Sequence, residues 1–152
     1  ELGGGVVRLG ERPYVTESPA TTGQLWFSGD ASKLVTLTAI SAFDTSAATL
    51  GGAVRLNALR FDRFAAGTEA QAGGGWLAAV VPLAVRVVSE SWIYASPRLG
   101  TLGRHPSFGL PAGVSIPLGS QLAVRGEAQV SWEDFKYYNR RIHLGLGVAY
   151  QW

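Results

Sequence analysis

The polarity of the last twelve residues, 141–152, alternates along the chain without an exception. One set of alternate positions is apolar or aromatic, and the other set holds only small or polar residues. The first set is Ile142, Leu144, Leu146, Val148, Tyr150 and Trp152. A period of two predicts a β-strand with one apolar face. This strand alone is equally compatible with a soluble sandwich, in which the apolar face would meet the core.

Two preceding segments, 107–118 and 121–133, alternate in the same way, so the chain ends in three consecutive long strands. Strands of soluble proteins usually have about 5 or 6 residues, whereas a tilted strand needs about 9 to 11 residues to cross a bilayer. A tight turn at 119–121 and a longer polar and aromatic loop at 134–140 connect the three strands. Alternation of short turns with longer loops is typical of outer-membrane barrels. Strand length and connections therefore favour a membrane barrel.

The same rule, applied backwards along the chain, predicts five more strands. They lie near 85–97, 73–81, 50–63, 33–43 and 4–15. The predicted fold is a single domain over residues 1–152, an all-β, closed, antiparallel, up-and-down, eight-stranded transmembrane β-barrel. Its longest loop, 17–32, contains Trp26 and Phe27. The region 73–97 fits the pattern least well, because Pro82 and Pro97 interrupt strand pairing.

A short repeat accompanies the predicted strands. Val-Arg pairs occur at 7–8, 54–55, 85–86 and 124–125, each early in a strand, with Val predicted to face outward and Arg inward. The repeat indicates four related hairpins, and chance recurrence in a chain rich in Ala, Val and Arg is the alternative. The glycine clusters at 3–5 and 73–75 do not match a phosphate-binding loop. We expect them to let strands bend or to make room for bulky inward neighbours.

Composition excludes several other classes of protein. Only 16% of the residues are charged, against about 25% in an ordinary soluble domain. The longest apolar run, 76–85, contains Pro82 and falls short of the roughly 20 residues of a spanning helix. Only helices and closed barrels satisfy the backbone in a bilayer, so closure of the sheet is expected. The net charge of +2 is too small and scattered to indicate nucleic acid as a partner.

Two absences from the sequence carry further expectations. The chain has no cysteine, which excludes disulfides and thiolate metal sites, and no cofactor is expected. It has no methionine and begins at Glu1, so we expect an exported protein whose signal peptide has been removed, with engineered trimming as the alternative.

The C-terminal segment 145–152 resembles the terminal signal of bacterial outer-membrane proteins. In that signal a Gly is followed by two hydrophobic or small residues, an aromatic, any residue and a final aromatic. Gly147, Tyr150 and Trp152 occupy the marked places, and Gly145 stands where a polar residue is more usual. With its strand lengths and count, the whole chain resembles the small eight-stranded barrels of the OmpA-like, OmpX and opacity-protein group. The resemblance implies insertion into a Gram-negative bacterial outer membrane by the barrel assembly machinery.

An eight-stranded barrel is only wide enough for its own side chains to fill the interior. We therefore expect a packed, ion-paired polar network inside it, because an uncompensated buried charge is costly. The expected network is Arg8, Arg55, Arg86, Arg125, Glu127, Gln129, Arg141 and His143. A charged pore lining for anions, with inward arginines setting selectivity, is the alternative. On the outer wall, Trp132, Tyr150 and Trp152 are predicted to lie at the membrane rims.

Three classes of function remain open at this stage. The favoured one is a structural or partner-binding envelope protein that acts through its outer loops or outer wall, in contact with outer-membrane lipid and an envelope protein. A lipid-modifying enzyme or a narrow pore is the second. His105 and Ser107 faintly resemble the His-x-Ser motif of lipid A deacylases, but Phe108 replaces the usual Asn. A soluble lipocalin-like carrier is the third, and polar inward residues such as Arg125 disfavour it.

Overall fold

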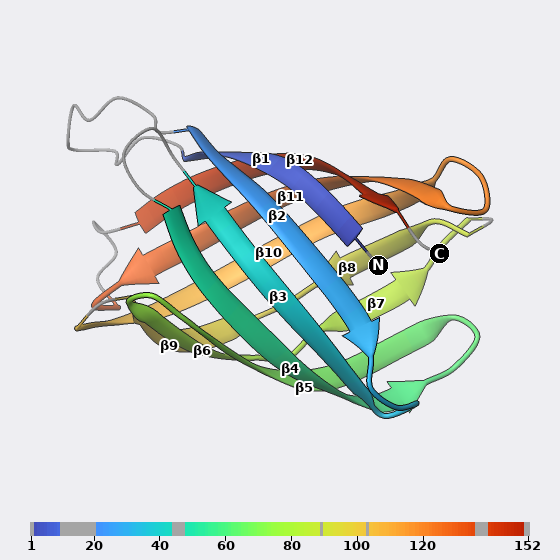
Figure 1. The fold of residues 1–152 in the computed structure, drawn as a ribbon, viewed down its shortest axis with the longest axis horizontal. Coiled ribbons are helices and arrows are strands. Elements are labelled where there is room, and N and C mark those ends of the chain that lie inside the picture. The colour runs from blue at the N-terminus through green and yellow to red at the C-terminus, as the bar shows by residue number, and fades with distance from the viewer. Residues whose placement is uncertain are drawn as a thin grey trace.

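The computed structural model describes residues 2–9, 21–43, 48–88, 90–102, 104–135 and 140–150. This part of the chain is all-β, and its antiparallel strands follow one another round a common axis (Figure 1). In chain order the strands are β1 Leu2–Leu9, β2 Thr21–Asp30, β3 Val35–Phe43, β4 Ala48–Arg60, β5 Phe64–Gly73, β6 Trp76–Val80, β7 Leu83–Arg86, β8 Trp92–Ala95, β9 Arg98–Leu102, β10 His105–Pro117, β11 Leu122–Glu133 and β12 Arg140–Tyr150. No helix in the described ranges is long and apolar enough to cross a membrane.

Pairing closes the strands into a ring. Each of β1 to β5 pairs with the next strand along the chain, β10 pairs with β11, and β11 pairs with β12. The last strand returns to the first, since β12 pairs with β1 from Leu2 opposite Tyr150 to Leu9 opposite His143. A closed ring leaves no strand edge unpaired, as a lipid environment requires.

Two prolines divide what are structurally two long strands. β6 and β7 both pair with β5, and β8 and β9 both pair with β10. Pro82 and Pro97 separate the halves because proline has no N–H to donate to a neighbouring strand. Their carbonyl groups still take part: Gly67 N donates to Pro82 O at 3.0 Å, and Val81 N donates to Pro97 O at 2.9 Å. The register therefore runs on through both interruptions.

The twelve strands of the described residues consequently occupy ten places in the ring, because β6 with β7 and β8 with β9 each share one place. The predicted number of eight is wrong. Two strands were missed, β2, which was predicted to be loop, and β5. β2 has mixed polarity on both faces, with Trp26 lining the interior and Phe27 exposed. The outward face of β5 carries Thr68, Ala70 and Ala72, so its hydrophobic alternation is weak.

The outer wall is apolar, as the alternation of the long strands predicts. In β12 the predicted outward row is exposed from Ile142 to Tyr150, and Leu146 exposes 68% of its surface. Leu50 on β4 exposes 75%. A bulge shifts the register of β4 against β5 between Leu56 and Leu59, and both leucines are about half exposed. The extra residue of the bulge keeps apolar side chains on the outer face after the shift.

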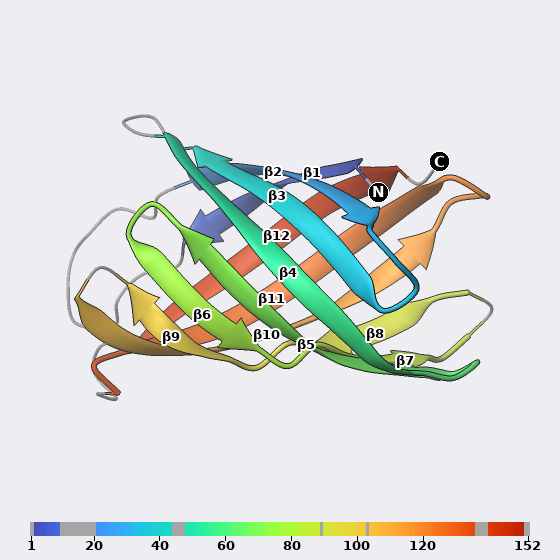
Figure 2. The same cartoon turned by 60° about the horizontal axis from the view of Figure 1, so that its bottom comes forward.

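The two ends of the barrel differ. The start of β1 and the end of β12 lie at one end of the barrel, as Figures 1 and 2 show. We call this end the terminal mouth and the opposite end the distal mouth. The connections 31–34, 61–63, 87–91 and 118–121 lie at the terminal mouth. At the distal mouth, β5 and β6 are joined by Gly74 and Gly75 alone, and Gly75 has a φ of 86°, which favours glycine. The rule used to predict the strands puts the short turns at one mouth and the longer loops at the other. The connection between β5 and β6 at the distal mouth is shorter than 87–91 at the terminal mouth, so the rule did not locate the strands on either side of these connections.

Candidate functional site

The interior of the barrel holds a cavity of about 1170 Å³ among the described residues. Its lining reaches from Asp30 and Arg60, next to the terminal mouth, to Thr49 and Glu133, next to the distal mouth. The prediction of a filled interior followed from the strand number of eight and is wrong for the same reason. Ten places make a wider ring, and the width of a barrel grows with its number of strands.

Glycines let bulky inward side chains lie along the wall instead of projecting into the cavity. Trp76 on β6 lies across Gly73 and Gly51, because a Cβ added at Gly51 would come 2.6 Å from Trp76 Cζ2. The 73–75 glycine cluster was expected to serve in this way, and Gly73 does. Trp76 therefore belongs to the cavity wall and not to the membrane rim.

The same device recurs on β10. A Cβ at Gly113 would come 2.7 Å from the hydroxyl of Tyr94, and a Cβ at Gly109 would come 2.6 Å from Arg98 Nε. Tyr94 and Arg98 thus lie against the β10 backbone. Large polar side chains line this side of the cavity without crossing it.

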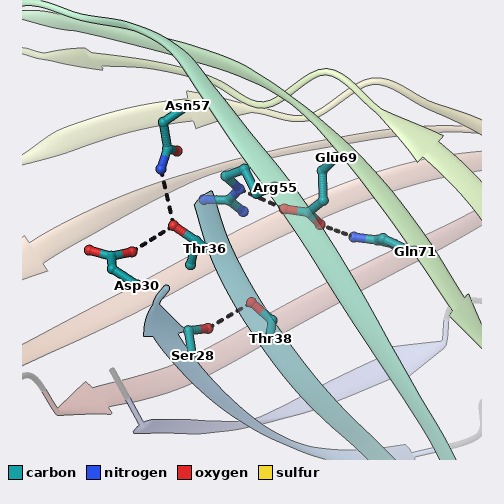
Figure 3. Close-up of polar contacts among 8 residues, drawn as sticks. All are labelled: Ser28, Asp30, Thr36, Thr38, Arg55, Asn57, Glu69 and Gln71. Carbon is teal, nitrogen blue, oxygen red and sulfur yellow. Dashed lines mark hydrogen bonds and ion pairs between the residues drawn. The ribbon is translucent and has the colours of Figure 1, made fainter. Parts of the chain in front are cut away.

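A compact polar group on β4 and β5 forms one side of the cavity (Figure 3). Arg55 and Glu69 are directly opposite each other in the register, and Arg55 Nε donates to Glu69 Oε2 at 2.6 Å. Gln71 Nε2 donates to the other carboxylate oxygen, Oε1. Glu69 exposes only 7% of its surface. Both oxygens of this buried carboxylate have partners, as burial of a charge requires.

Further hydrogen bonds continue this side toward the terminal mouth, as Figure 3 shows. Asn57 Nδ2 donates to Thr36 Oγ1 at 3.1 Å, and Thr36 Oγ1 donates to Asp30 Oδ1 at 2.6 Å. The hydroxyl groups of Ser28 and Thr38 are 2.9 Å apart. Hydroxyl and amide groups and the carboxylate of Asp30, from β2, β3 and β4, therefore line this part of the cavity.

A second group of Arg, Glu and Gln lies half-way round the ring from β4, on β11. Tyr94 donates its hydroxyl to Glu127 Oε2 at 3.1 Å. The guanidinium of Arg125 lies 5.8 Å from the centroid of the Trp26 ring, within the range of a cation–π interaction. Gln129 exposes 8% of its surface, and its Nε2 has no hydrogen-bond partner among the described residues.

Two further contacts lie between this group and the distal mouth. Ser131 Oγ and His143 Nε2 are 3.0 Å apart, and Arg141 Nη2 pairs with Glu133 Oε1 at 3.0 Å. All four side chains line the cavity. Ion pairing was expected inside the barrel, and Arg141 pairs with Glu133, which was not among the predicted residues.

The structure brings six of the eight residues of the predicted network into the cavity wall. They are Arg55, Arg125, Glu127, Gln129, Arg141 and His143. The other two are Arg86 and Arg8. Arg86 is exposed beside the terminal mouth, with its guanidinium 5.3 Å from the centroid of the Trp92 ring, and does not line the cavity. Arg8 lies on β1 opposite Leu144 in the register, and its side chain is outside the part of the structure that is described.

Sequence reasoning missed Glu69, Tyr94, Arg98 and Trp26. Glu69 lies in the missed strand β5, and Trp26 was assigned to a loop. Arg98 follows Pro97, where the predicted strand ended, although the strand register continues through that proline. If the alternation of inward and outward positions had been continued through Pro82 and Pro97, it would have placed Tyr94 and Arg98 on the inward face.

Two of the predicted rim residues, Trp132 and Tyr150, lie at or next to the ends of strands. Trp132 lies opposite Phe108 near the distal mouth, with ring centroids 5.6 Å apart. Tyr150 ends β12 at the terminal mouth and is 39% exposed. Gly147 lies inside β12 and lines the cavity. Trp152 lies outside the described residues.

The faint enzyme-like motif occurs at the distal mouth. His105 Nδ1 is 3.1 Å from Asp134 Oδ1, and both groups are reachable by solvent. Ser107 lines the cavity, whereas an enzyme that acts on lipid would present its nucleophile to lipid. In the described part of the chain, no group of three His, Cys, Asp or Glu residues is arranged to hold a metal ion.

No protein-family model and no curated protein matches this sequence. Solved structures do match its fold. The NanC porin superposes with a TM-score of 0.65 over 100% of both chains, at 8% sequence identity. The KdgM porin in complex with disordered oligogalacturonate gives a TM-score of 0.57 over 99% of both chains, at 8% identity. Another structure of the KdgM porin gives 0.55 at 7% identity. The chain therefore shares the fold of porins, a small antiparallel β-barrel.

Proposed function

We propose that the protein is a channel in the bacterial outer membrane that lets small hydrophilic solutes diffuse through its lumen. The observation that carries the proposal is the polar-lined cavity of about 1170 Å³, whose lining extends from strand ends at one mouth to strand ends at the other. The likeness to porin folds supports this reading. An aqueous path through a barrel requires interior side chains that hold water, and hydroxyl, amide and charged groups do so.

The outer wall supports a membrane location. Large apolar side chains are exposed on most strands, among them Leu50, Leu99, Leu144 and Leu146. Monomeric soluble proteins rarely expose contiguous apolar patches of more than a few hundred Å². The same surface in lipid costs nothing, because hydrocarbon is as apolar as leucine. A lipocalin-like carrier would reverse this arrangement, with its polar face outside.

The arrangement of the bulky interior residues favours a channel over a filled structural barrel. Trp76, Tyr94 and Arg98 lie over glycines of neighbouring strands, along the wall of the cavity. A filled barrel would use these side chains to pack against one another across the lumen.

Partner binding through the distal loops is a second candidate function. Asp134 and Phe135 both have a φ of 54°, which is uncommon for residues other than glycine, and Phe135 is 58% exposed. An exposed aromatic on a conformationally constrained turn is suited to contact with a protein or lipid headgroup. Such contacts are compatible with conduction.

The C-terminal strand is the proposed determinant of insertion. Gly147 and Tyr150, with Trp152, would be read by the barrel assembly machinery, and the ring is completed only when β12 pairs with β1. Replacement of Tyr150 by Ser is expected to lower the amount of folded protein in the outer membrane, measured by heat-modifiable migration of membrane fractions.

The channel proposal is tested by electrical recording. Purified, folded protein in planar bilayers is expected to give discrete single-channel steps. Thr38 lines the cavity, whereas its neighbour Leu37 is 49% exposed on the outer wall, which makes a matched pair on β3. Thr38→Trp is expected to reduce conductance and Leu37→Trp to leave it unchanged. Folded protein without steps, or equal effects of the two variants, would contradict the proposal.

A further inference from the structure

We infer that the turns of the terminal mouth anchor the barrel in the membrane, because their apolar side chains enter the acyl chains of the adjacent phospholipid leaflet. The inference rests on the membrane location proposed above and not on conduction. It adds a partner for the turns, which is lipid hydrocarbon. Each of the connections 31–34, 61–63, 87–91 and 118–121 carries at least one exposed large apolar side chain. These side chains are Leu34, Phe61, Val87, Val88 and Leu118.

The turn after β10 continues the outward row of that strand. Val114 and Ile116 are exposed on the outer wall, and Leu118 is the next alternate position. Leu118 N donates to Leu122 O at 2.7 Å, and Leu122 is exposed at the start of β11. Because residues that face each other across a hairpin lie on the same side of the sheet, the apolar row passes through the turn without a break.

The turns after β4 and β7 continue outward rows in the same way. Phe61 follows the exposed Leu59 at the next alternate position, and Phe61 N donates to Phe64 O at 2.8 Å. Val87 follows the exposed Val85, and Val87 N donates to Ser91 O at 3.0 Å. We call Phe61, Val87 and Leu118 the apolar tips.

The chemistry of the apolar tips fits hydrocarbon and not the headgroup layer. Tyr and Trp suit the headgroup layer because one end of the side chain is polar. Phe, Val and Leu have no polar end, so transfer from water into acyl chains is favourable for the whole side chain. The turn between β5 and β6 at the distal mouth consists of Gly74 and Gly75 and offers no such side chain.

The height of the outer wall gives the same position for the tips. Near the distal mouth Trp132 lies opposite Phe108, and Leu118 follows Phe108 by ten residues. Such a length of strand is about 33 Å, and at a tilt of about 40° it rises about 25 Å, which is the height of the apolar band of outer-membrane barrels. With Trp132 at one edge of the band, as the sequence predicts, the other edge falls at Leu118.

Fluorescence quenching tests the position of the tips. The chain has no cysteine, so single thiols can carry a bimane label at chosen positions. Folded Phe61→Cys and Leu118→Cys are labelled and inserted into phosphatidylcholine vesicles with or without bromine on the acyl chains. Brominated lipid should quench both labels, and iodide in the water should quench them little. Heat-modifiable migration verifies that each variant is folded.

Each tip has a matched control in its own turn. Asp62 and Ser120 are polar and exposed, and they lie one and two residues beyond Phe61 and Leu118. Labels on Asp62→Cys and Ser120→Cys should be quenched by iodide more strongly than the tip labels and by brominated lipid less strongly. Leu37→Cys, on the outer wall of β3, should be quenched by brominated lipid and not by iodide.

Replacement of the tips gives a second readout that needs no label. Phe61→Ser/Leu118→Ser shortens the apolar band, so the barrel should fit thick bilayers less well than the wild type does. The folded fraction in long-chain phosphatidylcholine, divided by that in short-chain phosphatidylcholine, should fall by about a factor of two. Ser120→Ala should keep the wild-type ratio.

The outcomes separate this inference from the proposed function. A Leu37→Cys label that iodide reaches and brominated lipid does not would overturn the membrane location and the anchored turns together. If brominated lipid quenches Leu37→Cys, but iodide quenches the tip labels as strongly as those on Asp62→Cys and Ser120→Cys, the anchored turns alone are overturned. A wild-type folding ratio in Phe61→Ser/Leu118→Ser would overturn them as well.

Discussion

The two Arg, Glu and Gln groups of the lumen contain the same residue types but differ in how they are satisfied. On β4 and β5, Arg55 and Glu69 are cross-strand partners, so the guanidinium meets the carboxylate directly. On β11 the three residues follow one another at every second position, and their contacts go to other strands: Glu127 to Tyr94 and Arg125 to Trp26.

The comparison teaches how register decides the electrical role of a side chain. Opposite charges on adjacent strands neutralise each other within one pair, because partner residues are about 5 Å apart. The same charges along one strand are separated by about 6 to 7 Å and reach sideways instead. One group is therefore a closed pair on adjacent strands, and the other reaches Tyr94 and Trp26 on other strands.

The largest expected loss of stability follows when the closed pair of Arg55 and Glu69 is broken. Glu69→Ala removes both acceptors of Arg55 and Gln71, and hydrogen bonds to charged groups contribute about 1.5–3 kcal/mol each. The midpoint of thermal unfolding in detergent should fall clearly, and Glu90→Ala, in an exposed turn, should leave it unchanged. Equal midpoints for the two variants would show that the pair does not stabilise the barrel.

A smaller loss of stability is expected when the group on β11 is changed, which we call the open group because its contacts go to other strands. Glu127 accepts one described hydrogen bond, from Tyr94, so Tyr94→Phe should lower the free energy of unfolding by about 1 kcal/mol. Glu127→Ala should lower the unfolding midpoint less than Glu69→Ala does. If Glu127→Ala lowers it more, the distinction between a closed and an open group is wrong.

The glycine positions give a third prediction, on conductance. Gly109→Ala places a Cβ 2.6 Å from Arg98 Nε, and a flexible side chain moves away more easily than backbone does. Arg98 should turn into the lumen and reduce single-channel conductance. Gly126→Ala is the matched control, because its Cβ would meet only Val114 at 3.9 Å. Unchanged conductance in Gly109→Ala would mean that Arg98 does not limit the passage.

The sequence predicted the class of fold and much of the lumen wall, but not the size of the ring. Long strands of strict alternation, β10 to β12, were located closely, because lipid on one side and water on the other impose a period of two. β5 was missed because its outward residues are small and its inward residues polar. Pro97 ended a predicted strand because a missing donor looks like a strand end, although the proline carbonyl keeps the register.

The candidate site was predicted in part for a related reason. Inward parity identified Arg55, Arg125 and Glu127 as lumen residues within correctly placed strands. It could not show that Arg55 meets Glu69, because cross-strand partners depend on register, which a single strand pattern does not contain. The open cavity follows from ring size together with glycine positions, and both emerge only when all strands are in place.

The central claim is that the lumen is open to water along its wall, and cysteine accessibility tests it most directly. The chain has no cysteine, so Thr38→Cys and Leu37→Cys each create a single thiol, on the lumen side and the outer side of β3. During bilayer recording, a water-soluble thiol reagent should reduce the current of Thr38→Cys and leave that of Leu37→Cys unchanged. An unmodified Thr38→Cys in folded protein, or modification of Leu37→Cys alone, would contradict the account.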